Sequence, residues 1–426
     1  MRGAMRNTGM ALAVVGVGLG APGCDGGAGG AAMVSDSAGI EVVTNREGSV
    51  EAAVSWSLSG SPVLEIGGGT SPEEPLFRIS AVAPLGDGAV AVGTETPPQA
   101  LVFGADGSLR AVLGRQGGGP GEFARVASIV SFGGDSIAVW DPDRRRISVF
   151  TRSGEFVREV DLSGIAPLGI MAAPNTRSEA AWTHLKPGLE GGFVLFSVGG
   201  FGPGEGARRP AAPSYRLSAD GEVVAELGSF PGFQSYSSER TGVTLYPFGA
   251  DTHGAVSGEL LVVGTAESPE LRYFGPDGDL RRIVRWPDLD RPVEGRPVEI
   301  WDSMLASWLA DMPERQGRMM REVFDRVPRP ERFPAYDGVI PGPDGSVWVG
   351  EYVGMLSVPN LPLDRRVPAR RWLVLDSAGV LVAAVETPAG FQPHEAMADP
   401  IGTRVWGVYR DELDVESVRA YDVESR

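Results

Sequence analysis

GGGPGEFARVASIVSFGGDSIAVWDPDRRRISVFTRSGEFVREV, residues 117–160, contains one complete structural unit of this chain. Short apolar runs alternate in it with Gly- and Asp-containing turns, which is typical of β-strands joined by tight turns. The four predicted strands are Ala124–Phe132, Ile137–Trp140, Arg146–Thr151 and Phe156–Val160. Four consecutive strands with such short connections predict an antiparallel meander.

The same pattern recurs along the chain. A Gly/Asp turn leads into a short apolar strand at Gly86–Thr94, Gly133–Asp141, Glu190–Val198, Ser257–Thr265, Pro343–Glu351 and Ile401–Arg410. Five of these are followed by a strand–turn–strand unit, at Val102–Leu113, Val149–Val160, Tyr215–Leu227, Tyr273–Val284 and Leu373–Val385. A recurring strand–turn–strand unit predicts the blades of an all-β, six-bladed β-propeller.

Residues 117–160 resemble the NHL-repeat class of six-bladed propellers. The resemblance rests on the lead-in GGGPGEF, on Asp141 closing the second strand, on Arg146 opening the third, and on the turn residue Gly154. Over most of residues 37–426 the chain resembles bacterial lipoproteins described only as six-bladed β-propellers. The resemblance implies a propeller fold and a structural pairing of Asp141 with Arg146, and it implies no particular activity.

Both ends of the chain are predicted to contribute to the last blade. That blade has strand patterns at Arg404–Tyr409 and Val418–Tyr421, and the chain then ends one strand short. The segment Ser55–Gly67 has a spare strand pattern. We therefore expect this N-terminal segment to close the ring, which removes an exposed sheet edge.

The repeat is interrupted between the fourth and fifth blades. Within residues 290–330, apolar side chains at helical spacing predict a helical hairpin with a break at Asp311 and Pro313. Its apolar face is explained by packing on the propeller. Because the insertion is expected on the same face as the longest loops, a partial lid over a binding face is the functional alternative.

The first residues have the pattern of an export signal. Residues 1–23 combine Arg2 and Arg6 with the apolar run Met10–Leu19, which is too short to span a bilayer comfortably, and Cys24 follows. This resembles a bacterial lipoprotein signal, in which Cys24 carries the lipid and residues 24–36 form a flexible tether to a propeller at 37–426. We expect a lipid-anchored envelope protein; an ordinary secretory signal, giving a soluble periplasmic protein, is the alternative.

Composition restricts the partners. The formal net charge is −17, so binding to nucleic-acid phosphates is not expected. With one cysteine, Cys24, the chain forms no internal disulfide. A monomer is expected.

The glycine-rich segment Gly114–Phe123 superficially resembles a phosphate-binding loop. It has no Gly-Lys-Ser/Thr and leads into a strand rather than a helix, so nucleotide binding is rejected. The glycines are explained by a tight passage between blades. Arg115 and Glu122 remain candidates for facing a pocket.

The ends of the second strands supply the remaining candidates. Aligned repeats place Thr94, Asp141, Ser197, Glu351 and Tyr409 at similar positions, expected to point toward the central opening. Asp141, Glu351 and the nearby Asp411 are a candidate carboxylate cluster for Ca²⁺, as in six-bladed lactonases. The structural alternative is that Asp141 caps its turn, and no cofactor is then expected.

The leading functional hypothesis is a non-catalytic binding module for a peptide, glycan or envelope protein. The candidate ligand-binding residues are Arg115, Glu122, Asp141, Arg144, Glu351, Arg410 and Asp411. The alternative is a Ca²⁺-dependent lactonase-like hydrolase or a lyase with its site in the central channel. The three histidines, His184, His253 and His394, are far apart in sequence and lack zinc-motif spacing, and no GxSxG is present, so no catalytic role is predicted for them.

Overall fold

The computed structural model describes residues 32–68, 76–165, 181–200, 204–239, 242–354, 367–399 and 402–425. Residues 31–426 form one compact unit. The predicted signal, Cys24 and most of the tether lie outside the described residues. Among the helices of the described ranges, none is long and apolar enough to cross a membrane.

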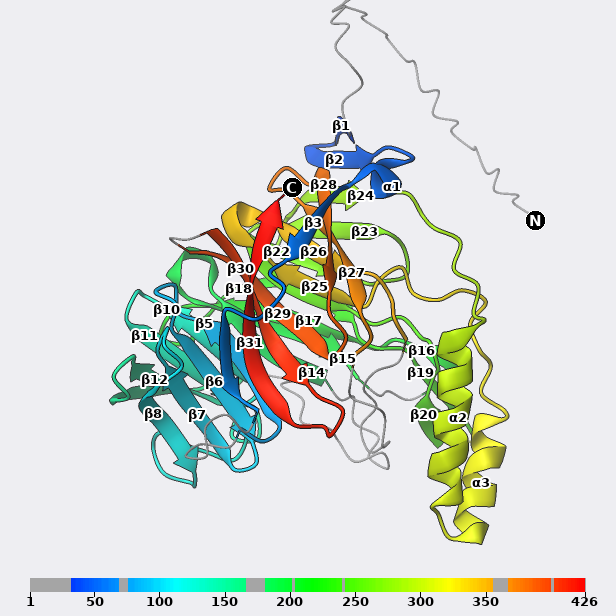
Figure 1. Cartoon of the computed structure of the whole chain (residues 1–426), viewed down its shortest axis with the longest axis horizontal. Helices are drawn as coiled ribbons and strands as arrows, with labels where there is room; N and C mark the ends of the chain where they lie inside the picture. Colours follow the sequence, from blue (N-terminus) through cyan, green and yellow to red (C-terminus); the bar gives the residue numbers. More distant parts are fainter. Residues whose placement is uncertain are drawn as a thin grey trace, which may run out of the picture. The chain divides into compact units, whose positions relative to one another are not determined.

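Antiparallel meanders, in which each strand pairs with the next one along the chain, make up most of the unit (Figure 1). The first comprises β5 (Ile79–Pro84), β6 (Val90–Glu95), β7 (Pro98–Phe103) and β8 (Leu109–Gln116), extended by β9 (Glu122–Phe123). The second comprises β10 (Ser128–Phe132), β11 (Ser136–Asp141), β12 (Arg146–Thr151) and β13 (Phe156–Asp161). The third comprises β14 (Ala181–Pro187), β15 (Phe193–Gly199), β17 (Ala211–Leu217) and β18 (Val223–Pro231).

Three further meanders follow. The fourth comprises β21 (His253–Ser257), β22 (Leu260–Gly264), β23 (Glu270–Phe274) and β24 (Leu280–Arg285). The fifth comprises β25 (Gly338–Pro341), β26 (Val347–Gly350), β27 (Arg370–Leu375) and β28 (Leu381–Thr387). The last comprises β29 (Phe391–Asp399), β30 (Gly402–Arg410) and β31 (Glu416–Ser425). Single-turn 3₁₀ helices at Leu189–Gly191 and Pro343–Gly345 precede β15 and β26.

The strands predicted from the repeat are confirmed. Each predicted apolar strand coincides with the second strand of a meander, from β6 to β30, and each strand–turn–strand unit coincides with a third and fourth strand. Gly154 shows why the turns need glycine. Its φ is 96°, and a Cβ there would lie 3.1 Å from the Val112 carbonyl oxygen of the neighbouring meander.

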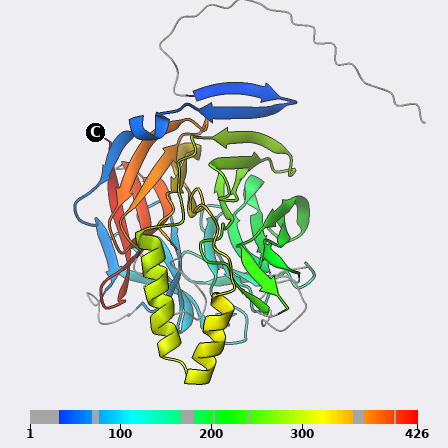
Figure 2. The same ribbon diagram turned by 90° about the vertical axis from the view of Figure 1, so that its right-hand side faces the viewer.

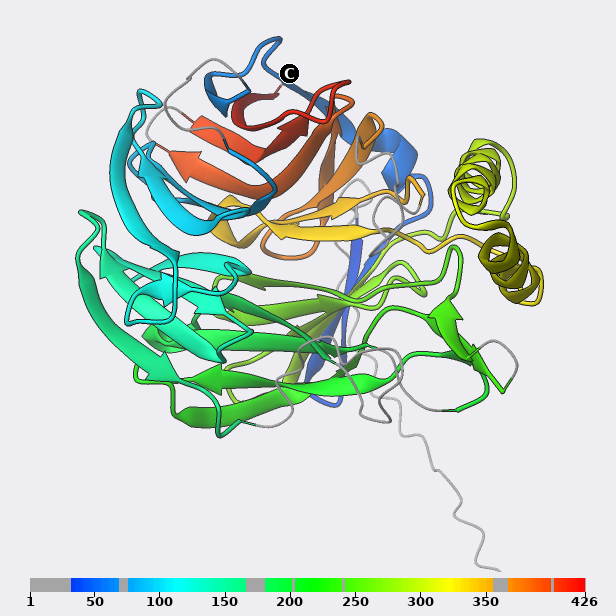
Figure 3. The ribbon, with the colours of Figure 1, turned by 90° about the horizontal axis from the view of Figure 1, so that it is seen from below.

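Successive meanders pack face to face through apolar side chains. Within the described residues, one buried cluster joins each meander to the next, from the first to the sixth. A further cluster joins the sixth back to the first, with Trp406 and Val418 against Val92 and Phe103. The innermost strands β5, β10, β14, β21, β25 and β29 contact one another in the same circular order. In Figure 3 the first and sixth meanders (cyan and red) accordingly lie together.

The N-terminal segment completes the last meander, as predicted. Strand β4 (Leu64–Gly67) pairs antiparallel with β31 as its fourth strand, and β3 (Val54–Leu58) bridges β28 and β31. The sequence did not predict the hairpin of β1 (Ala32–Ser37) and β2 (Ile40–Asn45), which extends the fourth meander because β2 pairs in parallel with β24. The short helix α1 (Ser49–Ala52) links β2 to β3.

The predicted helical hairpin is confirmed. It consists of α2 (Arg296–Ala310) and α3 (Glu314–Phe324), which pack side by side (Figure 2). Trp301 of α2 is buried against Phe248, so the apolar face is used for packing, while Ile300 of α2 and Met319 of α3 are exposed.

One region lies outside the six meanders. The first strand of the fourth meander, β21, begins at His253. Residues 242–245 instead form β20 (Gly242–Leu245), which joins β16 (Gly206–Arg208) and β19 (Ser235–Ser238) in a separate small sheet. Its apolar pattern serves the hairpin, because Leu245 packs in the same cluster as Trp301.

Candidate functional site

The glycine-rich segment at 114–123 is held by its own contacts. The Glu122 carboxylate accepts a hydrogen bond from the Gly119 N–H at 2.9 Å and pairs with Arg115 at 3.4 Å. These donors, the Gly119 N–H first, lower the pKa of the Glu122 carboxyl. Arg115 is 81% exposed, so the predicted pair lies on the surface.

Asp141 lies at the centre of a buried capping network. Its side chain is fully buried and accepts hydrogen bonds from the backbone N–H groups of Ala124, Asp143 and Arg144, and from the Arg144 guanidinium at 3.1 Å. Arg144 also donates to the Gly117 carbonyl. Asp141 and Arg144 therefore fasten the glycine-rich segment to the turn between β11 and β12. The pairing of Asp141 implied by the resemblance was with Arg146, whose guanidinium instead pairs with Glu159.

The other predicted residues are engaged elsewhere. Glu351 pairs with Arg371 at 3.0 Å, and Arg410 pairs with Glu416 at 2.8 Å. Asp411 accepts the N–H groups of the turn that follows it. Among the described residues, no group of three His, Cys, Asp or Glu side chains could hold a metal ion, so Asp141, Glu351 and Asp411 do not form a shared site.

The expected ring of second-strand ends also differs. Thr94, Asp141 and Ser197 are nearly fully buried, and the Thr94 hydroxyl donates to the Pro97 carbonyl. Because the second strand lies one position outward from the innermost strand, its end residues meet their own meander rather than the opening.

The innermost strands carry a different set of residues. Every histidine of the chain and its only lysine lie on them: His184 and Lys186 on β14, His253 on β21, and His394, with Glu395, on β29. In the circular order of contacts β21 follows β14, while β29 lies three positions away and hence opposite it. These side chains therefore come from both sides of the space that the innermost strands surround.

Local strand geometry directs these side chains. Side chains two residues apart share one face of a strand, so His184 and Lys186 share a face, while Leu185 packs toward the second meander. On β29 the register shifts between Pro393 and Glu395, which leaves His394 as the extra residue of a β-bulge. A bulge re-aims neighbouring side chains, and bulges are frequent next to functional sites.

Burial and Lys186 together control the protonation of this set. Burial lowers the pKa of His184 to about 4, although its side chain keeps contact with solvent. Burial likewise lowers the pKa of His394 to about 4 and that of His253 to about 3. The Lys186 charge acts in the same direction on all three histidines.

Glu395 and Lys186 perturb each other. Burial raises the pKa of Glu395 to about 7, although the Lys186 charge opposes this rise. Burial lowers the pKa of Lys186, and the Glu395 charge opposes that change. The two groups therefore interact electrostatically, and pKa values moved toward neutrality mark functional groups more often than structural ones.

The histidine, lysine and glutamate side chains on the innermost strands lack hydrogen-bond and ion-pair partners within the described residues. Within the described part of the chain, Lys186, Glu395, His184 and His394 have no hydrogen bond or ion pair, and the buried Nε2 of His253 has no partner. The arginines that act on the histidines are all paired. Arg125, Arg209, Arg370 and Arg410 bind Asp143, Glu267, Asp337 and Glu416, respectively. Lys186 is thus the cation of this region that lacks a counter-ion in contact.

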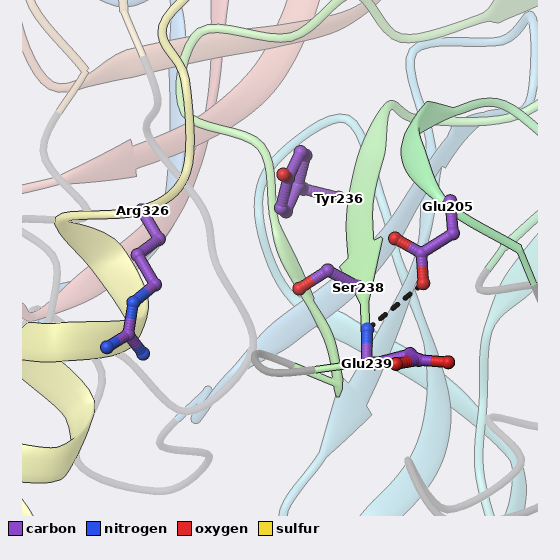
Figure 4. A pocket seen from close by; sticks show the side chains of 5 residues that line it. All are labelled: Glu205, Tyr236, Ser238, Glu239 and Arg326. Atoms are coloured by element: carbon purple, nitrogen blue, oxygen red, sulfur yellow. Dashed lines mark hydrogen bonds between the residues drawn. The ribbon is translucent and has the colours of Figure 1, made fainter.

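A cavity lies at the protein surface, away from the innermost strands. It has a volume of about 460 Å³ and lies between α3, which is followed by Arg326, and the small sheet that carries Tyr236 (Figure 4). The Glu239 N–H donates to the Glu205 carboxylate at 3.1 Å. The charged residues that line this cavity are exposed, and Arg326 pairs with Glu322 of α3.

Sequence reasoning missed the central set because it treated the histidines one at a time. The sequence did contain a signal. Each histidine precedes an apolar second strand, and the segment before a second strand is the position of the innermost strand in the repeat. The single lysine among 38 basic residues was a further signal.

No protein-family model matches the chain, and no curated protein is similar to it. Solved structures match most of the chain, at low similarity. A member of the DUF4221 family from Bacteroides vulgatus is 11% identical, with a TM-score of 0.44, over 87% of this chain and 99% of that one. Virginiamycin B lyase from Staphylococcus aureus is 11% identical, with a TM-score of 0.39, over 80% and 94%. A gluconolactonase from Xanthomonas campestris is 12% identical, with a TM-score of 0.36, over 82% and 86%. At this similarity a shared activity does not follow.

Proposed function

We propose that this chain is an exported six-bladed β-propeller that binds a small anionic organic ligand in its central channel. The observation that carries the proposal is the convergence of Lys186, Glu395 and the three histidines on one interior space without internal partners. Among them, within the described residues, the His253 Nε2 is buried without a hydrogen-bond partner, which is costly inside a protein, and the other four side chains are free to contact a ligand.

The six-bladed architecture is supported by the circular packing of the meanders. An apolar cluster connects each neighbouring pair, and the N-terminal strand β4 completes the sixth meander. In such a ring the innermost strands line the central channel, where propellers place ligands. The lipid anchor on Cys24 remains part of the proposal, on the basis of the leader sequence alone.

The charges favour an anion. Lys186 supplies a positive charge without a contacting counter-ion, and the histidines are neutral at pH 7 because their pKa values are low. Glu395, with a pKa of about 7, can accept or donate a hydrogen bond on the opposite side. A molecule that carries a carboxylate and a second polar group can interact with both Lys186 and Glu395. A peptide C-terminus or an acidic glycan also fits, which preserves a role in binding an envelope partner.

Thermal unfolding with a panel of small organic acids, including pyruvate and lactate, tests the proposal. A bound acid is expected to raise the midpoint, and Lys186→Met to weaken binding by about ten-fold or more, as for loss of a charged hydrogen bond. Arg216→Met is the matched control, because Arg216 is in the same meander but pairs with Glu190 at 2.6 Å. Equal binding by wild type and Lys186→Met would contradict the proposal.

Acid–base catalysis is a second candidate function, favoured by Glu395 alone. A carboxyl group with a pKa near 7 is suited to donate and accept protons at neutral pH, as in a lyase or a lactonase. Turnover of a bound acid or lactone that is lost in Glu395→Gln, while binding persists, would support it.

The Ca²⁺-dependent alternative has a separate test. Since Asp141, Glu351 and Asp411 have separate internal partners, we expect neither Ca²⁺ nor EDTA to change the unfolding midpoint. A Ca²⁺-induced rise that EDTA reverses would show a metal site and contradict this expectation.

A further inference from the structure

We propose that the Lys186 amine is a covalent capture site for carbonyl compounds, forming an imine with an aldehyde or ketone in the channel. This inference rests on the proposed function, because the carbonyl compound must first bind between β14 and β29. It adds a reaction type and a substrate class, of which 2-oxo acids are the simplest members that also carry the anionic group.

The geometry supports this role in three ways. Lys186 has no carboxylate in contact, so no ion pair holds its nitrogen protonated in place. Lys186 is partly buried, and burial lowers the pKa of its amine, so part of the population is neutral and nucleophilic while the protonated form attracts an anion. An ionisable carboxyl, Glu395, lies on the opposite strand of the channel, where it can reach the far side of a bound molecule.

The step balances without a further reactant. The nitrogen lone pair of Lys186 attacks the carbonyl carbon and forms a C–N bond as the C=O π bond breaks. The proton released from the nitrogen passes to the former carbonyl oxygen, which gives a neutral carbinolamine. Glu395 then donates a proton to the departing hydroxyl, which leaves as water while the C=N bond forms. No atom is oxidised or reduced overall, and the water leaves through the channel.

The composition of the chain limits the positions at which an imine can form. Lysine is absent elsewhere, and the arginines near the channel are paired and cannot form imines under these conditions. The N-terminal amine is the other primary amine of the chain. A covalent adduct can therefore be assigned to one of two positions.

Reductive trapping tests the inference. The full chain is incubated at pH 7 with pyruvate and sodium cyanoborohydride, and the reduced adduct is located by peptide mass spectrometry. We expect one adduct, at Lys186, forming at least about ten-fold faster than on N-acetyl-lysine amide, because the buried amine is more often neutral. Adduct formation no faster than on this free amine, or only at the N-terminal amine, would overturn the inference.

Two variants separate capture from binding. Lys186→Arg keeps the positive charge and is expected to bind pyruvate, seen as a raised unfolding midpoint, but to form no internal adduct. Glu395→Gln keeps a hydrogen-bonding side chain but has no carboxyl proton to donate, so it is expected to slow trapping more than it weakens binding. If pyruvate stabilises the wild type without any adduct, covalent capture is wrong and the binding proposal stands; if no organic acid stabilises the protein and none is trapped, both are wrong.

Discussion

Replacing Asp141 with alanine is expected to lower the free energy of unfolding by about 3 kcal/mol, the range seen when one partner of a buried hydrogen-bonded ion pair is removed. The carboxylate is fully buried and accepts three backbone N–H groups as well as the Arg144 guanidinium. Without it, the Ala124 N–H loses its acceptor inside the protein, and Arg144 loses its counter-ion. Equilibrium denaturation of the wild type and the variant measures the difference.

Asp411→Ala is the matched control. Asp411 also follows a second strand and accepts two N–H groups of its turn, but those bonds are exposed to solvent. Water replaces them on substitution, so a loss of about 1 kcal/mol or less is expected. Similar losses for the two variants would show that Asp141 does not hold the glycine-rich segment. Trapping of pyruvate by a folded Asp141→Ala protein is expected to persist, because Asp141 lies outside the channel set.

Acidification is expected to destabilise the protein steeply between pH 6.5 and about 4. The folded protein lowers the pKa of His184 and His394 to about 4 and that of His253 to about 3, from 6.5 in the unfolded chain. The unfolded chain therefore binds more protons in this interval, and stability falls as the pH falls. The contribution is fully present above pH 6.5. Lys186, Arg125, Arg209, Arg370 and Arg410 surround the histidines and strengthen the effect.

Glu395 acts with the opposite sign. Its pKa is raised from 4.5 to about 7, so the folded protein binds the extra proton. The stabilisation by this group is complete below pH 4.5 and is lost as the pH rises through 7. The two effects place the greatest stability near neutral or slightly acidic pH.

Unfolding midpoints measured from pH 4 to 9 test both signs. Substituting the three histidines with glutamine is expected to flatten the acid limb, and Glu395→Gln is expected to flatten the decline above neutral pH. An acid limb that is unchanged in the triple variant would contradict the placement of the histidines inside the channel. Circular dichroism at pH 7 confirms that each variant is folded.

The repeat in the sequence was sufficient to predict the meanders, the closing N-terminal strand and the helical hairpin. These features follow from local rules: alternation of apolar residues, turn glycines such as Gly154, and helical spacing around Trp301. Such rules act over a few residues and are visible in the chain itself.

The sequence alone could not decide the β1–β2 hairpin or the small sheet at β16, β19 and β20. Both depend on which partner is available in space. Val43 is buried because β2 pairs with β24, more than two hundred residues away, and Leu245 is partly buried because it packs against the cluster of Phe248 and Trp301. Neither segment has a local sequence pattern that predicts which distant strand or helix it contacts.

The candidate site shows the same division. The sequence by itself determined that the chain has one lysine and three histidines, and its repeat determined which strands carry them. Only the tertiary structure placed Lys186 and Glu395 on opposite strands of the innermost set, because the first and last meanders pack against each other. It also assigned Asp141, Glu351 and Arg410 to internal partners. Electrostatic interaction depends on distance in space and on burial, and neither quantity is a property of spacing along the chain.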